Sequence, residues 1–134
     1  MICKENKEIG EKYDYIQHKS GLGVYVVPKK MSTSYAIFGT KFGSIDNRFV
    51  SDGKEIVLPD GIAHFLEHKM FEQEDGTDAF LRFAKTGANA NAYTTFERTC
   101  YLFSATSNFY ESLEILLDFV SHPFFTDATV QKEM

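Results

Sequence analysis

The segment 60–72, DGIAHFLEHKMFE, has the pattern of a short helix that is apolar around most of its circumference. Three titratable residues, His64, Glu67 and His68, fall on one stripe of this helix because residues three and four apart are neighbours on a helical surface. An unpaired imidazole or carboxylate is costly to bury. The chain must therefore fold so that the stripe meets a partner.

The ends of this helix can also be predicted. Asp60 is a good N-cap residue, and Pro59 ends the extended segment before it. Lys69 and Glu72 lie near the other end and are expected to reach solvent.

A divalent metal would satisfy the stripe. Two neutral histidines at i and i+4, here His64 and His68, are a standard pair of zinc ligands. A carboxylate beside them that is not a ligand, here Glu67, is placed to take a proton from metal-activated water. The alternative is a purely structural helix in which the two histidines form salt bridges with their own glutamate.

The rest of the chain alternates between strand and helix patterns. Runs 13–18 and 22–27 predict a hairpin, 34–43 a third strand, and 44–59 a long loop with a short strand at 55–58. A helix over 78–86 is capped by Thr77 or Asp78 and ended by Gly87, and strands follow at 91–96 and 99–105. Apolar spacing predicts a helix over 108–121, and another begins at Thr126 or Asp127.

This order of elements indicates an α+β fold, with a largely antiparallel sheet and helices packed on one face. At 134 residues the chain has the size of one domain, 1–134, in which residues 1–12 are expected to be a poorly ordered or helical lead-in. The last helix reaches Met134 without a residue that would end it. The domain is therefore expected to be incomplete.

Charge and composition exclude several classes of partner. The formal net charge is −5 and no block of basic residues occurs, which argues against nucleic acid and anionic membrane surfaces as partners. No apolar run approaches the length of a membrane span, and the first residues lack the features of a signal peptide. A cytoplasmic location is expected, with Cys3 and Cys100 as reduced, inert thiols.

The H-x-x-E-H order on a helix is that of the inverzincins, and the chain resembles the pitrilysin or insulinase family of zinc metallopeptidases. The similarity includes the stretches GLGVYVVP, GTKFGSID, DGIAHFLEHKMFE and GANANAYTTFERTCYLF, and continues in FYESLEILLDFVSHPFFTDATVQKEM. It runs from about Leu22 to the last residue, and it is nearest to the bacterial processing-protease-like branch.

This resemblance implies a metal site with one Zn²⁺, held by His64 and His68, and Glu67 as the general base. The third ligand of the family is a Glu, which is expected beyond Met134. Glu133 corresponds to an earlier acid of the same helix that lies near the metal, and is assigned an accessory catalytic role. Glu111 and Glu114 lie on the wrong stripe to replace the missing ligand.

The resemblance also implies a substrate and partners. The family binds an extended peptide at a sheet edge, here Asn91, Ala92, Tyr93 and Thr94, although these four are equally plausible as ordinary strand residues. The parent protein would be a metalloendopeptidase that works with a homologous second half or subunit. The fragment alone is expected to be inactive, to bind zinc weakly, and to self-associate if an apolar face is left uncovered.

Two other functions remain open. S-ribosylhomocysteine lyases resemble the motif but complete their metal site with a later cysteine, for which Cys100 is the candidate. The peptidase family also contains subunits that only bind peptides or build complexes, although such subunits usually lose the motif that is intact here.

Overall fold

The computed structural model describes residues 1–133, and side chains as far as residue 131. The chain divides into two compact units, Met1–Ser32 and Thr33–Met134, each of which is described by itself. The sequence predicted one domain. Segment 60–72, which carries His64, Glu67 and His68, lies entirely in the second unit.

The first unit is a three-stranded antiparallel sheet in the order β1-β2-β3, with strands β1 Ile2–Asn6, β2 Glu11–Gln17 and β3 Gly23–Val26. The β2–β3 hairpin was predicted, whereas residues 1–12, expected to be a poorly ordered or helical lead-in, contain β1 and the start of β2. All five residues of β1 are exposed. Apolar and polar side chains do not alternate along this strand. The strand forms through backbone pairing with β2, and the local sequence pattern does not predict such pairing.

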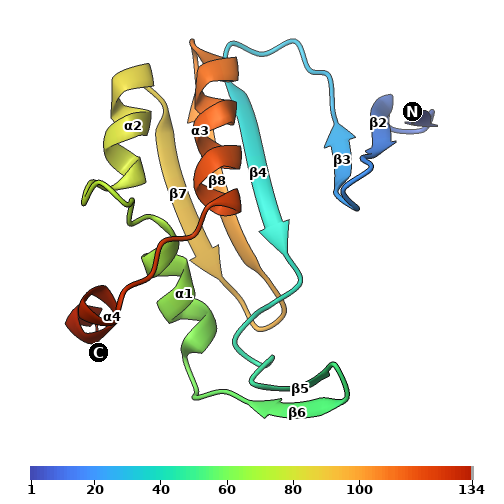
Figure 1. Ribbon diagram of the computed structural model, residues 1–134. Helices are drawn as coiled ribbons and strands as arrows, with labels where there is room; N and C mark the ends of the chain where they lie inside the picture. Colours follow the sequence, from blue (N-terminus) through green and yellow to red (C-terminus); the bar gives the residue numbers. More distant parts are fainter. Residues whose placement is uncertain (134) are drawn as a thin grey trace. The chain divides into compact units, whose positions relative to one another are not determined.

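The second unit is built on a three-stranded antiparallel sheet. Its strands are β4 Ser34–Thr40, β7 Asn89–Thr94 and β8 Thr99–Ala105, in the order β4-β8-β7. Helices α2 Ala79–Thr86 and α3 Phe109–Ser121 cover one face of this sheet, and α1 Ile62–Met70 lies beside β7 (Figure 1). The predicted α+β class is thus confirmed, with helices on one face of an antiparallel sheet.

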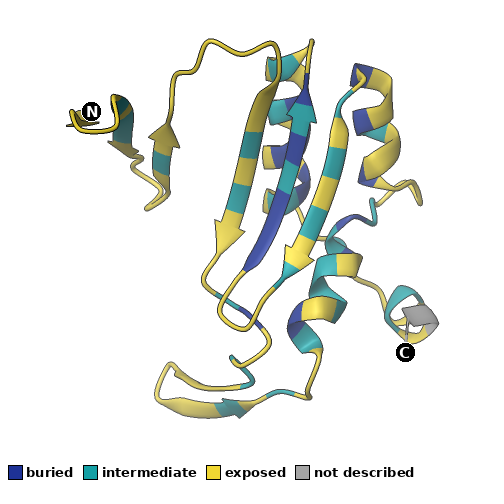
Figure 2. Ribbon diagram, turned by 180° about the vertical axis from the view of Figure 1, so that it is seen from behind, coloured by how far each residue is buried: buried dark blue, intermediate teal, exposed yellow. Residues whose placement is uncertain are grey.

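The core lies between the sheet and these two helices. The central strand β8 is buried or half-buried throughout, whereas β4 and β7 alternate along their length (Figure 2). Phe103 of β8, Phe83 of α2 and Phe119 of α3 are at most 1% exposed and form the centre of the core. Phenylalanine and tyrosine side chains therefore fill much of the layer between the sheet and the helices.

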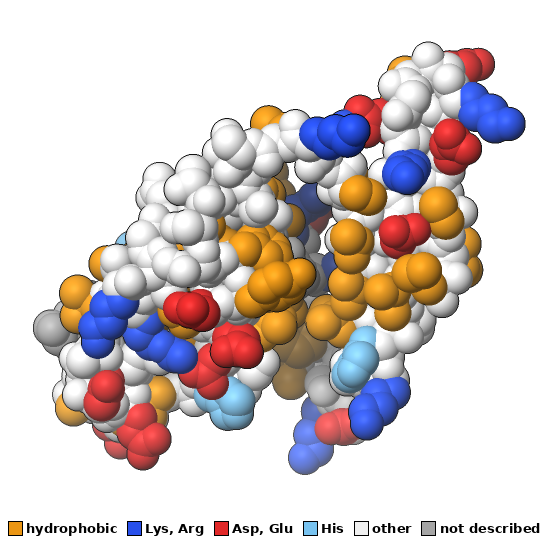
Figure 3. All heavy atoms as spheres, turned by 90° about the horizontal axis from the view of Figure 1, so that it is seen from above, with side chains coloured by type: hydrophobic (Ala, Val, Ile, Leu, Met, Phe, Trp, Pro, Cys, Tyr) orange, Lys and Arg blue, Asp and Glu red, His pale blue; other side chains and the backbone are white. Residues whose placement is uncertain are grey.

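The opposite face of the sheet carries no helix in the described part of the chain. Side chains of alternate residues point to it, and Tyr35, Ile37 and Tyr93 keep 57%, 47% and 41% of their surface exposed. Figure 3 shows hydrophobic side chains exposed at the molecular surface beside charged ones.

The segment between β4 and α1 forms a hairpin rather than a long loop with one short strand. Strands β5 Arg48–Ser51 and β6 Lys54–Val57 pair in antiparallel register. Asp52 and Gly53 connect them with φ angles of 50° and 73°. Positive φ at both central residues defines the turn that suits a two-residue hairpin, and Asp-Gly is a strong sequence signal for it.

The predicted ends of the second helix are confirmed. The Asp78 carboxylate accepts a hydrogen bond from the Phe80 N–H at 2.8 Å, and Gly87 ends α2 with φ 77°. The last helix, α4, spans Asp127–Glu133. Within the described residues, no helix is long and apolar enough to cross a membrane.

Candidate metal centre

Helix α1 begins after a glycine in the left-handed region. Gly61 has φ 83°, and its carbonyl accepts the first helical hydrogen bond from the Phe65 N–H at 2.9 Å. The prediction that Asp60 caps this helix was wrong, because the N-cap residue is Gly61. The Asp60 carboxylate instead accepts a hydrogen bond from Asn47 Nδ2 at 2.7 Å, and the freedom of Gly61 lets the chain turn one residue later.

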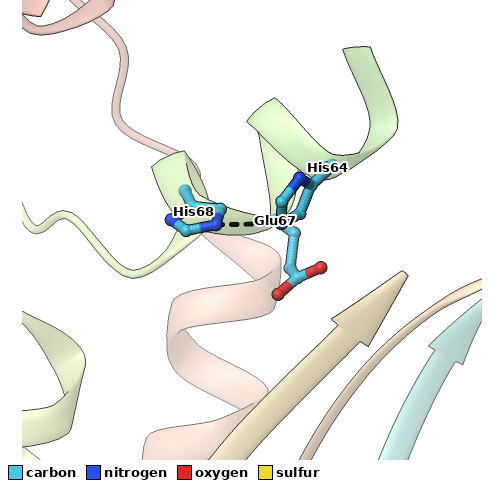
Figure 4. Close-up of side chains that lie close together, drawn as sticks. All are labelled: His64, Glu67 and His68. Atoms are coloured by element: carbon cyan, nitrogen blue, oxygen red, sulfur yellow. Dashed lines mark hydrogen bonds between the residues drawn. The ribbon is translucent and has the colours of Figure 1, made fainter. Parts of the chain in front are cut away.

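The two histidines of α1 converge as the i, i+4 spacing predicts. The Nε2 atoms of His64 and His68 lie 3.1 Å apart, and the two rings meet edge to face with centroids 4.7 Å apart (Figure 4). Both side chains are exposed. A direct hydrogen bond between them requires one Nε2 to donate and the other to accept, whereas two neutral Nε2 acceptors at this distance can share a cation.

Glu67 lies on the same stripe but is partly buried, and its carboxylate points toward strand β7 (Figure 4). The Thr94 hydroxyl donates a hydrogen bond to its Oε2 atom. One ligand atom from each of His64, Glu67 and His68 can be chosen so that all lie within 4.8 Å of one another. The stripe is thus a compact cluster of two nitrogens and a carboxylate, with the carboxylate held by a neighbouring strand.

The cluster fits the requirements of a zinc ion. Tetrahedral zinc with two imidazole ligands at about 2.0–2.1 Å places the two nitrogens about 3.3 Å apart. The 3.1 Å between the Nε2 atoms of His64 and His68 is close to this value. Imidazole nitrogen and carboxylate oxygen are also the donor types that zinc binds in proteins.

A buried tyrosine lies within the electrostatic reach of Glu67. Burial raises the pKa of the Tyr101 phenol to about 12, with the negative charges of Glu67 and Cys100 as smaller causes. Tyr101 is 4% exposed and packs in the core below the site. The phenol is therefore neutral at physiological pH.

A hollow of about 230 Å³ opens beside Glu67 and His68. Its walls come from α1, the start of α2 and the edge strand β7, and are formed by Glu67, His68, Phe71, Glu72, Asp78, Phe80, Asn91 and Ala92. The rings of Phe71 and Phe80 stack with centroids 4.3 Å apart and an angle of 10° between their planes. The hollow therefore combines an aromatic wall with acidic side chains next to the two histidines.

Strand β7 forms one edge of its sheet in the described residues, since it pairs only with β8. The Ala92 N–H donates to the Oδ1 atom of the preceding Asn91 at 2.8 Å, so this N–H lies outside the ladder with β8. The backbone of Ala92 thus faces the free edge, on the side of the strand where a further strand could pair.

The four strand residues predicted for substrate binding do not all lie at the hollow. Asn91 and Ala92 line it, and Thr94 contacts Glu67. The side chain of Tyr93 instead lies near Cys100, its partner in β8, and a hydrogen bond with that thiol raises the pKa of the phenol. Cys100 does not belong to the metal-binding cluster found among the described residues.

Lys69 was expected to reach solvent, and this expectation was wrong. Its side chain is 0% exposed, and Nζ donates hydrogen bonds to Glu72 Oε2 at 2.7 Å and to the Thr129 carbonyl at 2.6 Å. Glu72 itself keeps 27% of its side chain exposed. Lysine can be buried here because both partners accept from its ammonium group. The Glu72 partner is visible in the i, i+3 spacing, but the Thr129 contact has no signal in the sequence.

The remaining predicted acids are not in the cluster. Glu133 ends α4, and its side chain lies outside the described residues. Glu111 and Glu114 are on α3, and neither belongs to the His64, Glu67 and His68 group. Thr94, whose hydroxyl contacts Glu67, was predicted only as a strand residue that binds substrate.

The family resemblance is borne out by comparison with known proteins. Residues 55–134 match the model of the family described as Insulinase (Peptidase family M16). The chain therefore belongs to the insulinase family of peptidases, family M16.

Curated relatives agree with this assignment. The chain is 55% identical over 132 residues to YmfH, described as an uncharacterized zinc protease of Bacillus subtilis (strain 168), with 96% of this chain and 31% of YmfH covered. It is 36% identical over 81 residues to human nardilysin, with 55% of this chain and 7% of nardilysin covered. The chain thus spans less than a third of the length of either relative.

Solved structures share the fold. An M16-like peptidase from Alicyclobacillus acidocaldarius superposes with a TM-score of 0.87 at 44% identity, covering 92% of this chain and 29% of that one. Pitrilysin superposes with a TM-score of 0.72 over 97% of this chain and 14% of its own, at 18% identity. The second likeness concerns the fold alone.

Proposed function

We propose that this chain is the metal-binding part of a zinc-dependent endopeptidase that hydrolyses peptide bonds in extended or unfolded peptides. The observation that carries the proposal is the convergence of the Nε2 atoms of His64 and His68 at 3.1 Å beside the carboxylate of Glu67. His64 and His68 would hold the zinc ion. The third ligand is expected to be a Glu beyond Met134, with Glu133 in an accessory role.

The bound zinc would polarise the peptide carbonyl and lower the pKa of water to roughly 7. Glu67 would accept the proton of the attacking water and deliver it to the nitrogen of the leaving amine. Its Oε2 atom is occupied by the Thr94 hydroxyl, and Oε1 accepts no hydrogen bond from the described residues. The hydrogen bond from Thr94 would therefore hold Oε2 in place, while Oε1 would accept and release the proton.

The substrate would bind as an added strand on the free edge of β7. This mode needs an edge whose backbone groups are unpaired, and the Ala92 N–H meets that need because only the Asn91 side chain contacts it. The Asn91 carboxamide would move aside when a peptide pairs there. Asn91 and Ala92 also line the hollow, so the peptide backbone would run past His68 and Glu67. The side chain of Tyr93, on the other face of β7, would stabilise this strand through its contact with Cys100.

The whole enzyme would require more than this chain. Only two of the expected zinc ligands are among the described residues, so the isolated 134-residue chain is expected to bind zinc weakly and to have little peptidase activity. A homologous second half or subunit would close the site. The exposed apolar side chains on the helix-free face of the β4-β8-β7 sheet, such as Tyr35 and Ile37, support self-association of the isolated chain. A cytoplasmic location and the absence of nucleic-acid and membrane partners stay predictions.

The test is a set of substitutions in the full-length protein, with bound zinc and hydrolysis of an unstructured fluorogenic peptide both measured. Glu67→Gln should keep one zinc per chain and lower kcat by about 10²- to 10⁴-fold. His68→Ala should lose both zinc and activity. Glu74→Gln, which changes an exposed acid nearby, serves as the matched control and should change neither. Full activity in Glu67→Gln would remove Glu67 from the mechanism.

The same measurements, with one further variant at Cys100, separate the alternatives. A peptide-binding subunit without catalysis would bind the peptide but hydrolyse none of it in the wild type. A lyase-like site completed by Cys100 would lose its metal in Cys100→Ser, whereas the peptidase proposal expects unchanged zinc binding because Cys100 lies outside the cluster.

A further inference from the structure

The ammonium group of Lys69 is the feature of this site that the proposed chemistry does not use. Lys69 follows the proposed ligand His68 directly and is fully buried. Lysine is almost never fully buried unless it is paired, because its charge loses its hydration. Here the pairing is specific, since Nζ contacts Glu72 Oε2 at 2.7 Å and the Thr129 carbonyl oxygen at 2.6 Å.

These two bonds join different parts of the chain. Glu72 lies just after α1, so its contact is local, whereas Thr129 belongs to α4 and is 60 residues away. Among the hydrogen bonds of the described residues, Lys69 to Thr129 is the one that ties α4 to another element. The remaining bonds of this segment, which involve Thr126, Thr129 and Val130, stay within it.

We propose that Lys69 is a positioning residue that fastens α4 to the metal helix and thereby sets the geometry of the metal site. The inference rests on the proposed function, in which the chain that follows α4 supplies the third ligand. Because Lys69 and His68 are adjacent on α1, a bond from Lys69 to α4 places that following segment relative to the histidines. Glu72 holds the ammonium charge in place, and the carbonyl of Thr129 accepts a second of its three N–H donors.

The chemistry of the contact explains why lysine is suited to it. The position needs a long apolar stem that can be buried and a terminal group with several donors, of which one satisfies a carboxylate and another a carbonyl. Methionine matches the stem but cannot donate. Lys69→Met should therefore leave both acceptors unpaired and release α4, whereas Lys69→Arg keeps the donors and should restore the contact at least in part.

The test uses the full-length protein and measures zinc affinity by competition with a chromophoric chelator. Groups that orient metal ligands typically change metal affinity by about 10- to 100-fold when they are removed, so Lys69→Met should weaken zinc binding by that factor. The visible absorption of the cobalt-substituted protein should also change, because it reports the coordination of the metal. Amide exchange in α4 of the metal-free protein should become faster. Lys69→Arg should recover most of the affinity.

Ser112→Ala is the matched control for general loss of stability. Ser112 is also fully buried, and it shares hydrogen bonds with Thr86 Oγ1 and the Asn108 carbonyl at 2.8 Å and 2.9 Å. It should lower the melting temperature of the metal-free protein but leave zinc affinity and the cobalt spectrum unchanged. An equal loss of zinc affinity in both variants would overturn the positioning role.

Other outcomes are equally decisive. If wild-type protein binds zinc through His64 and His68 but Lys69→Met binds it as tightly, the inference about Lys69 is wrong and the proposed function stands. If the wild type binds no zinc, the proposed function itself fails. Should Lys69→Met not fold, Lys69→Gln replaces it. Its neutral amide can still donate a hydrogen bond, but the shorter side chain does not reach Thr129. Weaker zinc binding in Lys69→Gln would then support the inference, and unchanged zinc affinity would contradict it.

Discussion

The hydroxyl of Thr94 donates a hydrogen bond to Oε2 of Glu67 and so connects strand β7 to helix α1. The strand that would pair with a peptide and the carboxylate that would take a proton are therefore parts of one hydrogen-bonded unit. A peptide added to β7 would be placed relative to Glu67 by the sheet itself, without requiring the carboxylate to adopt a new position.

Removing this hydrogen bond should impair turnover more than binding. Thr94→Val keeps the β-branched shape that suits a strand but cannot donate to Glu67. A hydrogen bond to a charged group contributes about 1.5–3 kcal/mol, so kcat should fall by about 10- to 150-fold while KM changes little. Steady-state kinetics of peptide hydrolysis measure both constants. Thr94→Ser, which keeps the hydroxyl, should stay close to wild type, and an unchanged kcat in Thr94→Val would show that the bond does not orient the base.

The buried Tyr101 should make the protein less stable at high pH. Its pKa is raised to about 12 in the folded state, chiefly by burial, and is about 10 in an unfolded chain. Between these values the folded state binds more protons than the unfolded state, so stability is fully present below pH 10 and is lost as pH rises toward 12. Urea denaturation at several pH values from 8 to 11.5 tests this. Tyr101→Phe should show a smaller decrease over the same range, and equal slopes would contradict the assignment.

Much of the fold could be predicted because its signals are local. The carboxylate of Asp78 and the left-handed Gly87 mark the two ends of α2, and the spacing of apolar residues in α3 identifies its buried face. The strand β1 could not be predicted, because its residues are exposed and it exists through pairing with β2. The β5–β6 hairpin has a local signal in Asp52 and Gly53, although segment 44–59 as a whole has the pattern of a long loop.

The candidate site also has some features that the local sequence predicts and others that it does not. His64 and His68 converge because helical geometry alone brings i and i+4 together, so the sequence was sufficient. Glu67 and Lys69 each have one distant partner, Thr94 at 27 residues and Thr129 at 60 residues in sequence. Such contacts depend on how α1 packs against β7 and α4, which no periodicity in the chain encodes.

The aromatic core that supports α1 should depend strongly on Phe119. This ring is 1% exposed and its centroid lies 5.0 Å from that of Phe71 and 5.6 Å from that of Tyr101. Phe119→Ala should lower the free energy of unfolding by about 3–5 kcal/mol through lost burial and a residual cavity. Tyr110→Ala is the control on the same helix, because Tyr110 is 79% exposed, and it should change stability by less than about 0.5 kcal/mol. Similar losses in the two variants by chemical denaturation would contradict this account of the core.

Gly43, which follows β4, lies against the turn between β7 and β8. A Cβ atom at this position would lie only 2.4 Å from the Phe96 carbonyl oxygen and 2.5 Å from the backbone nitrogens of Glu97 and Arg98. The next residue is also bound to this turn, since the Ser44 N–H donates to the Thr95 carbonyl at 2.9 Å. Glycine is therefore required here by close approach of two backbones.

Gly43→Ala should displace the β7–β8 turn and, through it, Thr94, which directly precedes the turn. Overpacking of this kind typically costs about 1–3 kcal/mol, so the free energy of unfolding should fall by that amount. The kcat for peptide hydrolysis should fall as well, because the hydroxyl that holds Glu67 moves with the turn. Gly39→Ala in β4 is the control, since its Cβ would lie 3.4 Å from Cys100 Sγ, an ordinary contact. If Gly43→Ala lowers stability but leaves kcat at the wild-type value, the turn supports the fold without positioning the base.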